Sequence, residues 1–413
     1  MKTKNTNHGS NNHNTKIRNR ALVFRLICTG ENVSRIGIAR QTGLSKMSIS
    51  NIVAELIRDG FVREQKESPS KLKKPSTGRT PVVLVPDCET YAVIGLYISR
   101  DYAVSILSNL KCEILSEVKC NFTIEETNST FLNKITGITR EILSTKRAAG
   151  KKILGIGVSC IGPLDNKKGI ILQPPNFFHL SSIPIGQWLE KKFGYPVIVD
   201  NDMNASALAE KLYGKGRNIS NFVYVGVTNG IGSGIITNDT LYAGEMGFSG
   251  EIGHISINYE GPKCDCGNTG CLELYSSIPE IVKQAKISLE QGINSALKEY
   301  DFVQWGDIVR CAMEKDMLAL NIIDRLCMYI SIGIVSMINL FDPSVIFLGH
   351  DIAIAGRIVT EKMESYIKER TISRKYKEVP VQISAFKDKA PIVGSAALVL
   401  NQLFLGDGFE EGH

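Results

Sequence analysis

Four potential metal ligands that lie within eighteen residues restrict the possible folds of this chain more than any other feature. They follow the spacing H-x9-C-x-C-x4-C, with three glycines among them that permit tight turns: His254, Cys264, Cys266 and Cys271. Three thiolates and one imidazole match a tetrahedral set that binds Zn²⁺ in proteins. Because four protein ligands leave no open coordination position, the spacing predicts a structural zinc ion that folds the loop over residues 254–271.

Buried or disulfide-bonded cysteines are the alternative interpretation of this cluster. The N-terminal stretch MKTKNTNHGSNNHNTK is polar, and no apolar run reaches the roughly 18 to 20 residues that span a bilayer. We therefore expect a protein of the reducing cytoplasm without membrane insertion, where clustered thiols indicate a metal site. The other seven cysteines lie in apolar surroundings and are expected to be core residues: Cys28, Cys88, Cys112, Cys120, Cys160, Cys311 and Cys327.

Charge is distributed unevenly between two parts of the 413-residue chain. Residues 1–86 carry sixteen Lys and Arg against five Asp and Glu, a net charge of +11, whereas the remaining residues carry a net charge of −5. Such asymmetry favours an N-terminal module that binds a polyanion, attached to a neutral-to-acidic body. A basic face that is merely solvated is the alternative.

The basic segment carries the helix pattern of a helix-turn-helix. Residues 1–16 lack apolar periodicity and are expected to form a flexible tail. From Ile17, apolar residues recur at helical spacing until a Thr-Gly pair ends the first helix. Ser34 and Ser45 are N-cap residues for two further helices, and Gly43 suits the tight turn between them.

Two alternating segments, 61–65 and 81–85, flank a polar basic stretch and complete a winged helix-turn-helix domain over residues 17–86. The second helix of such a motif enters the major groove of DNA, and an arginine in the wing can enter the minor groove. A protein–protein docking module is the alternative. This second helix carries an apolar stripe of Ile49, Ile52, Val53, Leu56 and Ile57. The residues predicted to contact DNA point away from the stripe or lie in the wing: Lys46, Met47, Ser50, Asn51 and Arg79.

Beyond residue 86 the pattern changes to short apolar runs that end on glycine or polar turns, and helical stretches lie between them. Strands that alternate with helices predict an α/β architecture, here as two lobes that face a cleft. Ligands bind at the carboxyl ends of the strands in such sheets. The predicted strands cover residues 91–98, 153–160, 196–200, 221–228 and 344–349.

Three segments in a fixed order resemble the ROK family of bacterial sugar kinases and transcriptional repressors. They are VDNDMNASALAE (199–210), EIGH (251–254) and CDCGNTGCLE (264–273). The resemblance covers nearly the whole chain, because the repressor branch of the family carries an N-terminal winged helix. It implies an actin/hexokinase-like sugar-binding body of two α/β lobes over residues 87–413.

The resemblance also implies which residues form the sites. It assigns the four ligands of the cysteine cluster to the family's zinc site, with one ring nitrogen of His254 on the metal and the other on the sugar. Carboxylates and amides can pair with sugar hydroxyls. A helix cap at the end of a strand is the alternative role for Asn201, Asp202 and Asn204. The sugar pocket is assigned to Asn176, Asn201, Asp202, Glu251, His254 and Glu273.

The matching positions favour a repressor over a kinase. In the family's kinases the residue matching Asp202 is the general base, so this aspartate is a vestigial base candidate here. The kinases also have an Asp-x-Gly-Gly-Thr turn after the first strand, where glycine backbones approach the phosphates of ATP. In this chain Tyr97 replaces the aspartate of that turn, and Ser99 and Arg100 replace its glycines. His350 stands where the kinases usually have a further glycine.

The sequence therefore predicts a repressor, not an enzyme, that releases operator DNA when a monosaccharide binds, with xylose as the first candidate. We expect a homodimer or homotetramer, because paired DNA-binding domains fit a palindromic operator. Two alternatives stay open: an ATP-dependent sugar kinase with a DNA-binding appendage, and a repressor that a protein partner controls.

Overall fold

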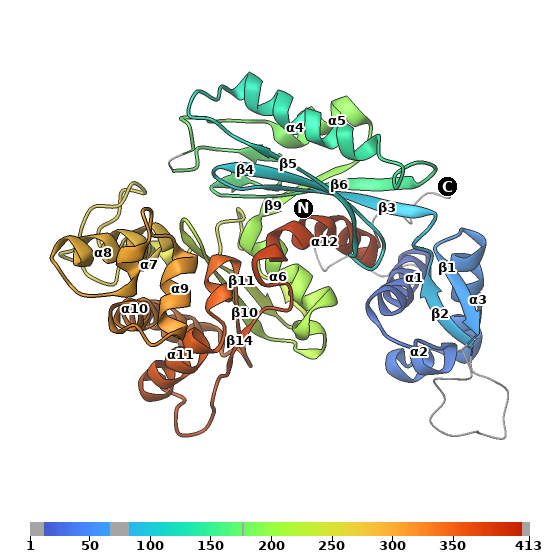
Figure 1. The fold of residues 1–413 in the computed structure, drawn as a ribbon. Helices are drawn as coiled ribbons and strands as arrows, with labels where there is room; N and C mark the ends of the chain where they lie inside the picture. The colour runs from blue at the N-terminus through green and yellow to red at the C-terminus, as the bar shows by residue number, and fades with distance from the viewer. Residues whose placement is uncertain (1–11, 67–81, 176, 407–413) are drawn as a thin grey trace.

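The computed structural model describes residues 12–66, 82–175 and 177–406, which form a small N-terminal domain and two α/β lobes (Figure 1). The N-terminal domain lies beside the first lobe. Two helices, α6 (Asp202–Tyr213) and α12 (Ala390–Leu405), lie centrally between the sheets of the two lobes. The predicted fold class, a two-lobed α/β body behind an N-terminal helical domain, is confirmed.

The N-terminal domain has the helix-turn-helix order that the sequence predicted. Ser34 accepts the backbone N–H of Gly37 at 3.2 Å, and Ser45 accepts that of Ser48 at 3.0 Å, so both serines cap helices as expected. Gly43 has φ 71° and ends the first of these helices in the left-handed conformation. The elements are α1 (Asn12–Thr29), α2 (Arg35–Thr42), α3 (Lys46–Arg58), β1 (Val62–Lys66) and β2 (Val82–Pro86).

Helix α1 begins at Asn12, earlier than the predicted start at Ile17. Its polar first turns have a tertiary partner, because Lys16 Nζ lies 2.8 Å from Glu55 Oε1 on α3. The spacing of apolar residues along the chain cannot predict a contact between two charged side chains on different helices. Residues 1–11 of the predicted tail and residues 67–81 of the predicted wing lie outside the described residues.

The first lobe is a five-stranded sheet in the order β5-β4-β3-β6-β9. Its central strand pairs antiparallel with β4 on one side and parallel with β6 on the other. Helices α4 (Asn128–Leu143) and α5 (Ile185–Phe193) cover one face of the sheet, and α12 covers the other. The strands are β3 (Tyr91–Ile98), β4 (Tyr102–Ser108), β5 (Ile114–Asn121), β6 (Lys152–Cys160) and β9 (Val197–Asn201), and a short hairpin adds β7 (Leu164–Asp165) and β8 (Ile170–Ile171).

The second lobe repeats this topology in the order β12-β11-β10-β13-β14. Again the first strand is central, with an antiparallel partner on one side and parallel partners on the other. The strands are β10 (Phe222–Val227), β11 (Ile231–Thr237), β12 (Thr240–Leu241), β13 (Ile346–Gly349) and β14 (Val381–Ile383). The helices of this lobe are α7 (Glu273–Ser276), α8 (Ile278–Glu290), α9 (Trp305–Met313), α10 (Met317–Phe341) and α11 (Arg357–Arg370).

Helix α10 is the one helix of the described chain that is long and apolar enough to cross a membrane. An 18-residue window of it has a mean hydropathy of 1.7, yet 56% of that window is buried within the protein. Ile330 and Ile334 are fully buried in the core of the second lobe. Core packing therefore accounts for its apolar character.

The two central helices pack closely because small residues face one another. A Cβ on Gly394 of α12 would lie 2.5 Å from the backbone of Ala205 on α6, and one on Gly157 of β6 would lie 1.8 Å from the carbonyl oxygen of Ser395. Glycine is therefore required at both positions. This close packing joins the two lobes through one helix pair.

Aromatic contacts join the N-terminal domain to the body. Phe24 of α1 packs edge to face on Phe404 of α12, with ring centroids 5.7 Å apart. Phe61 stacks on Tyr91 at 4.3 Å, and the Tyr91 hydroxyl donates to the backbone oxygen of Asp59 at 2.7 Å. The domain therefore packs on α12, the helix that contacts both the first-lobe strands and α6.

Candidate functional site

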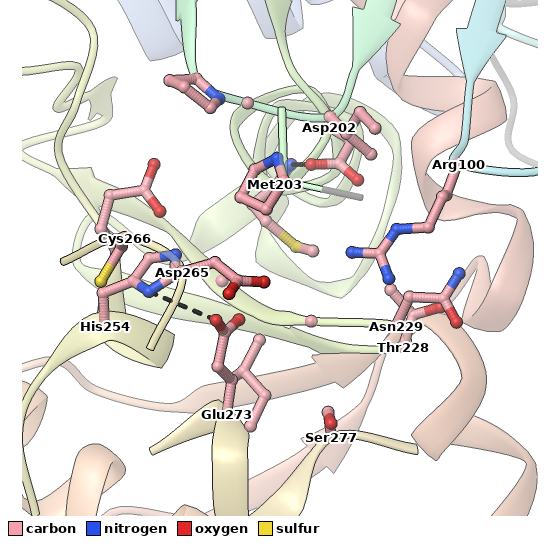
Figure 2. A pocket seen from close by; sticks show the side chains of 18 of the residues that line it. Arg100, Asp202, Met203, Thr228, Asn229, His254, Asp265, Cys266, Glu273 and Ser277 are labelled. Carbon is pink, nitrogen blue, oxygen red and sulfur yellow. Dashed lines mark hydrogen bonds and ion pairs between the residues drawn. The ribbon is translucent and has the colours of Figure 1, made fainter. Parts of the chain in front are cut away.

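A cavity of about 680 Å³ lies between the two lobes, at the carboxyl ends of parallel strands of both sheets (Figure 2). Residues that follow β3, β6 and β10, together with the end of β9, line it. One predicted sugar-binding residue, Asn176, lies outside the described residues. The other five all line the cavity: Asn201, Asp202, Glu251, His254 and Glu273.

Asp202 begins helix α6 and is only 3% exposed. Its Oδ1 accepts the backbone N–H of Met203 at 3.0 Å, and Asn201 Oδ1 accepts the same N–H at 2.8 Å. Asn201 is thus the N-cap of α6, as the alternative interpretation expected, and it also lines the cavity. The positive end of the helix favours a carboxylate at this place.

Asp200, which the sequence analysis did not single out, supports the same turn. Its Oδ1 accepts the side-chain amide of Asn204 at 3.0 Å and the backbone N–H of Asn201 at 2.7 Å. Burial raises the pKa of the Asp200 carboxyl, although these hydrogen bonds lower it. Asn204 thus supports the turn through Asp200 from within α6, and the cap of this helix is Asn201. The Asp-Asn-Asp order in the segment 199–210 is the signal that could have identified Asp200.

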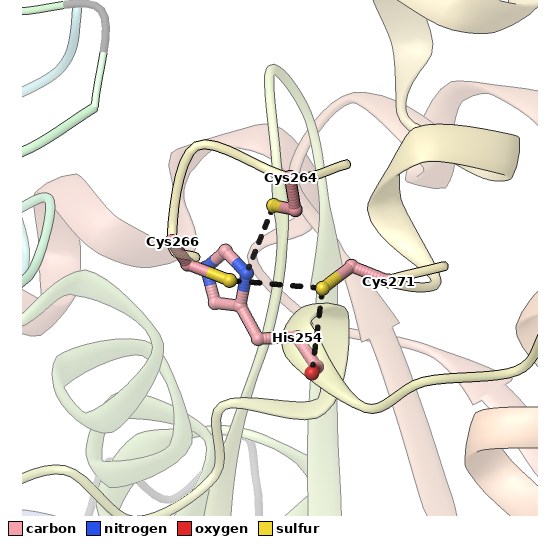
Figure 3. A group of neighbouring side chains, drawn as sticks. All are labelled: His254, Cys264, Cys266 and Cys271. Atoms are coloured by element: carbon pink, nitrogen blue, oxygen red, sulfur yellow. Dashed lines mark hydrogen bonds between the residues drawn. The ribbon is translucent and has the colours of Figure 1, made fainter. Parts of the chain in front are cut away.

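The four predicted metal ligands lie together (Figure 3), with all their ligand atoms within 4.8 Å of one another. A tetrahedral zinc ion with Zn–S bonds of about 2.3 Å places two sulfur atoms roughly 3.8 Å apart. The Sγ atoms of Cys266 and Cys271 are 3.7 Å apart, and Cys264 Sγ lies 3.8 Å from His254 Nδ1. These separations fit one bound divalent cation.

Backbone turns hold the ligands in this arrangement. The N–H of Cys264 donates to the oxygen of Asn268 at 2.9 Å, and that of Ile257 donates to the oxygen of Gly270 at 2.9 Å. A Cβ on Gly270 would lie 1.8 Å from the oxygen of Asn258, and its φ is 68°, so only glycine fits. Burial raises the pKa of the Cys264 thiol, and a bound cation would favour the thiolate instead.

The metal cluster and the cavity share side chains. His254 Nδ1 lies 3.4 Å from Glu273 Oε1, and the Cys264 thiol donates to the same carboxylate oxygen at 3.4 Å. Glu251 is accessible from the cavity, but the surrounding protein removes enough water to raise the pKa of its carboxyl. Figure 2 shows His254 and Glu273 at one end of the cavity, joined by the contact between Nδ1 and Oε1. A change in the metal loop would therefore reach the cavity directly.

Large side chains occupy the turn after β3, at the opposite end of the cavity. Arg100 points into the cavity beside Thr228 and Asn229 (Figure 2). The side-chain amide of Asn229 donates to Asp101 Oδ2 at 3.4 Å, so this turn also contacts the second lobe. Tyr97 lines the cavity, and burial raises the pKa of its phenol well above the usual value.

Helix α3 exposes one polar face at the surface of the N-terminal domain. Its apolar face is buried, as the spacing of the apolar residues in this helix predicted. On the opposite face Met47 is 73% exposed. Arg79 lies outside the described residues. The remaining residues predicted to contact DNA are all exposed on α3: Lys46, Met47, Ser50 and Asn51.

Comparison with known proteins shows which family has this sequence and fold. The sequence profile of the ROK family matches residues 93–402. The chain belongs to the ROK family. The resemblance in three short segments is therefore confirmed over most of the ROK body.

Two ROK relatives match the N-terminal domain as well as the body. The xylose repressor of Caldicellulosiruptor bescii is 30% identical over 388 residues, which cover 93% of this chain and 96% of the relative. A solved ROK family transcriptional regulator, described as a homolog of the E. coli Mlc protein, has a TM-score of 0.81 at 30% identity and covers 95% of this chain and 97% of its own.

A ROK kinase shares only the body. The ROK family glucokinase from Streptomyces griseus, solved with glucose and AMPPNP, has a TM-score of 0.67 at 25% identity. It covers 74% of this chain, although 98% of the glucokinase is matched. The regulator and this chain therefore share a part that the glucokinase lacks.

Proposed function

We propose that this ROK protein is a transcriptional repressor that binds operator DNA through its N-terminal domain and releases it when a monosaccharide enters the cavity. The observation that carries this proposal is the extent of the match, because a relative named xylose repressor covers 93% of the chain. The exposed polar face of α3, which carries Lys46, and the carboxylate-lined cavity support the two halves of the proposal. Such a protein acts where the chromosome is, in the cytoplasm.

Sugar recognition in this proposal depends on acceptors and donors that converge on one cavity. The carboxylates of Asp202 and Glu251 can accept hydrogen bonds from sugar hydroxyls. The side-chain amide of Asn201 can donate a hydrogen bond to a hydroxyl oxygen. His254 turns Nδ1 toward the thiols, which leaves Nε2 for a hydroxyl. A zinc ion on the cysteine cluster would hold this imidazole in place, because a metal–nitrogen bond fixes the orientation of the ring.

Kinase activity is less well supported than repression. Tyr97, Ser99 and Arg100 put side chains at the turn where the family's kinases place glycines against phosphate. A coupled assay of ATP turnover with xylose, glucose and N-acetylglucosamine tests this point. We expect no sugar-dependent turnover, and turnover at enzymatic rates, on the order of 1–100 s⁻¹, would contradict the proposal.

Operator release by sugar is the central test. Electrophoretic mobility shift of the full chain on its own promoter region, with and without each sugar of the same panel, measures it directly. We expect one sugar to lower operator affinity by about 5- to 150-fold, the range of a typical coupling free energy. Release that requires a protein extract and no sugar would favour control by a protein partner.

The structure offers a route from the cavity to the DNA-binding domain. Helix α6 starts at Asp202 in the cavity and runs roughly 18 Å along its axis. Just beyond its end, Arg217 donates to the backbone oxygen of Thr29 at 3.0 Å and to Glu31 Oε1 at 3.3 Å. Thr29 is the last residue of α1, directly before the helix-turn-helix. A shift of α6 on sugar binding would therefore reach the orientation of the DNA-binding domain.

Replacement Arg217→Ala tests this route. We expect sugar affinity and sugar-free operator affinity to change by less than about threefold, because the residue lies outside both sites and exposed ion pairs contribute little to stability. The sugar-dependent loss of operator affinity should fall below about fivefold. Arg357→Ala is the matched control, since Arg357 forms an exposed ion pair with Glu361 in the second lobe. If sugar lowers operator affinity equally in Arg217→Ala and Arg357→Ala, Arg217 does not belong to the route.

Replacement Lys46→Ala tests the DNA surface. We expect weaker operator binding and a decrease of about 1 in the slope of log affinity against log salt, because one phosphate contact is lost. Sugar affinity should not change. Lys298→Ala, which removes an exposed charge from the second lobe, serves as the control in a fluorescence anisotropy titration. An unchanged slope for Lys46→Ala would exclude Lys46 from the contact surface.

A further inference from the structure

His350 is a buried histidine that none of the proposed roles above uses. It follows strand β13 directly, is 3% exposed, and has φ 63°, a left-handed conformation that side chains rarely adopt. A Cβ on Gly226 of β10 would lie 2.6 Å from its Nδ1, so glycine at position 226 leaves room for the imidazole. A strained backbone that holds a buried imidazole is typical of a functional position.

Both ring nitrogens of His350 face polar groups. Nδ1 lies 3.1 Å from the hydroxyl of Tyr224, and Nε2 lies 3.7 Å from Asp202 Oδ2. Within the described residues, Nε2 is buried and has no hydrogen-bond partner. A buried N–H without a hydrogen-bond partner is unfavourable. The Asp202 carboxylate is the neighbouring acceptor to which an Nε2–H could donate.

The contact between Tyr224 and Nδ1 is compatible with either tautomer of His350, and an unprotonated Nε2 would turn its lone pair toward the Asp202 carboxylate, which favours the tautomer with the proton on Nε2. Tyr224 is fully buried, and burial raises the pKa of its phenol well above the usual value, so the hydroxyl keeps its proton. A neutral phenol that donates to Nδ1 leaves the ring proton on Nε2. The N–H of His350 then points at Asp202.

We propose that His350 is a positioning residue for Asp202, which it holds through its Nε2–H so that the carboxylate presents its free lone pairs to a sugar hydroxyl. Asp202 Oδ1 already accepts the N–H of Met203, and Oδ2 is the oxygen that faces His350. With one lone pair of each oxygen directed at the protein, the second lone pair of each oxygen remains for a ligand. This inference deepens the proposed function, because the ligand of Asp202 in it is the sugar.

Two replacements of His350 separate positioning from packing. Asparagine tolerates the left-handed conformation and can still contact Tyr224, but it is too short to reach Asp202. Glutamine is long enough to place an amide N–H where Nε2 lies. By isothermal titration we expect His350→Asn to weaken sugar binding at least tenfold and His350→Gln to remain within about threefold of the wild type. Sugar affinity that is equal in wild type and His350→Asn, or lost equally in both variants, would overturn the proposal.

A measurement without sugar distinguishes this inference from the proposed function. Selective ¹⁵N-histidine labelling of the full chain reports which ring nitrogen of His350 is protonated, with His350→Asn used to assign the signal. We expect the Nε2–H form in the wild type and a changed Nε2 resonance in Asp202→Asn. An unchanged resonance in Asp202→Asn would overturn the inference. If no sugar binds but the resonance changes, the sugar assignment is wrong and the His350–Asp202 contact stands.

Discussion

Replacement Cys264→Ser is expected to abolish zinc binding and, with it, the response of operator binding to sugar. A serine hydroxyl does not form the thiolate that structural zinc sites use, and the remaining three ligands leave the site incomplete. The loop that carries them has little hydrophobic content, and Tyr259 within it is 90% exposed, so apolar packing contributes little to the stability of the loop. Because His254 belongs to both the cluster and the cavity, and Glu273 of the cavity contacts His254 and Cys264, sugar affinity should fall about 100-fold.

Metal analysis by mass spectrometry and isothermal titration with sugar check this result. We expect one zinc ion per chain in the wild type and none in the variant, while operator affinity without sugar stays the same. Cys120→Ser is the matched control, since Cys120 is half-buried on β5, remote from the cluster in the fold. Removal of zinc from the wild type with a chelator should reproduce the defect. A zinc-free variant that still releases operator on sugar addition would contradict the proposed role of the metal.

The second large effect is expected for Asp202→Asn. The replacement keeps the shape of the side chain and an oxygen that can accept the N–H of Met203, so α6 should still begin at the same place. It removes a charged acceptor for a sugar hydroxyl, and hydrogen bonds to charged groups contribute about 1.5–3 kcal/mol. We therefore expect sugar affinity to fall roughly 10- to 150-fold, measured by isothermal titration.

Operator binding without sugar separates this effect from a general loss of structure. It should match the wild type in Asp202→Asn, and the midpoint of thermal unfolding should stay close to that of the control Asp301→Asn, which alters an exposed aspartate of the second lobe. A variant that loses operator binding in the absence of any ligand would show that Asp202 has been assigned to the wrong site.

Local features of the sequence predicted local features of the structure. Ser34, Ser45 and Gly43 marked the boundaries of the helix-turn-helix, because a capping side chain bonds to backbone groups within three residues of itself. The metal ligands were identified in the same way, since turns within one short loop bring them together. The start of α1 was misplaced because its polar first turn has its ion-pair partner, Glu55, on another helix.

The sequence by itself determined the family, the helix-turn-helix and the composition of the metal cluster, because each depends on residues close together in the chain. Only the tertiary structure placed Arg217 on the backbone of Thr29, across 188 residues, and His350 between Tyr224 and Asp202. The physical reason is that periodicity and capping record contacts within a few turns of the chain. Contacts between distant segments arise from packing of whole elements, here the close approach of α6 and α12 between two sheets of the same topology.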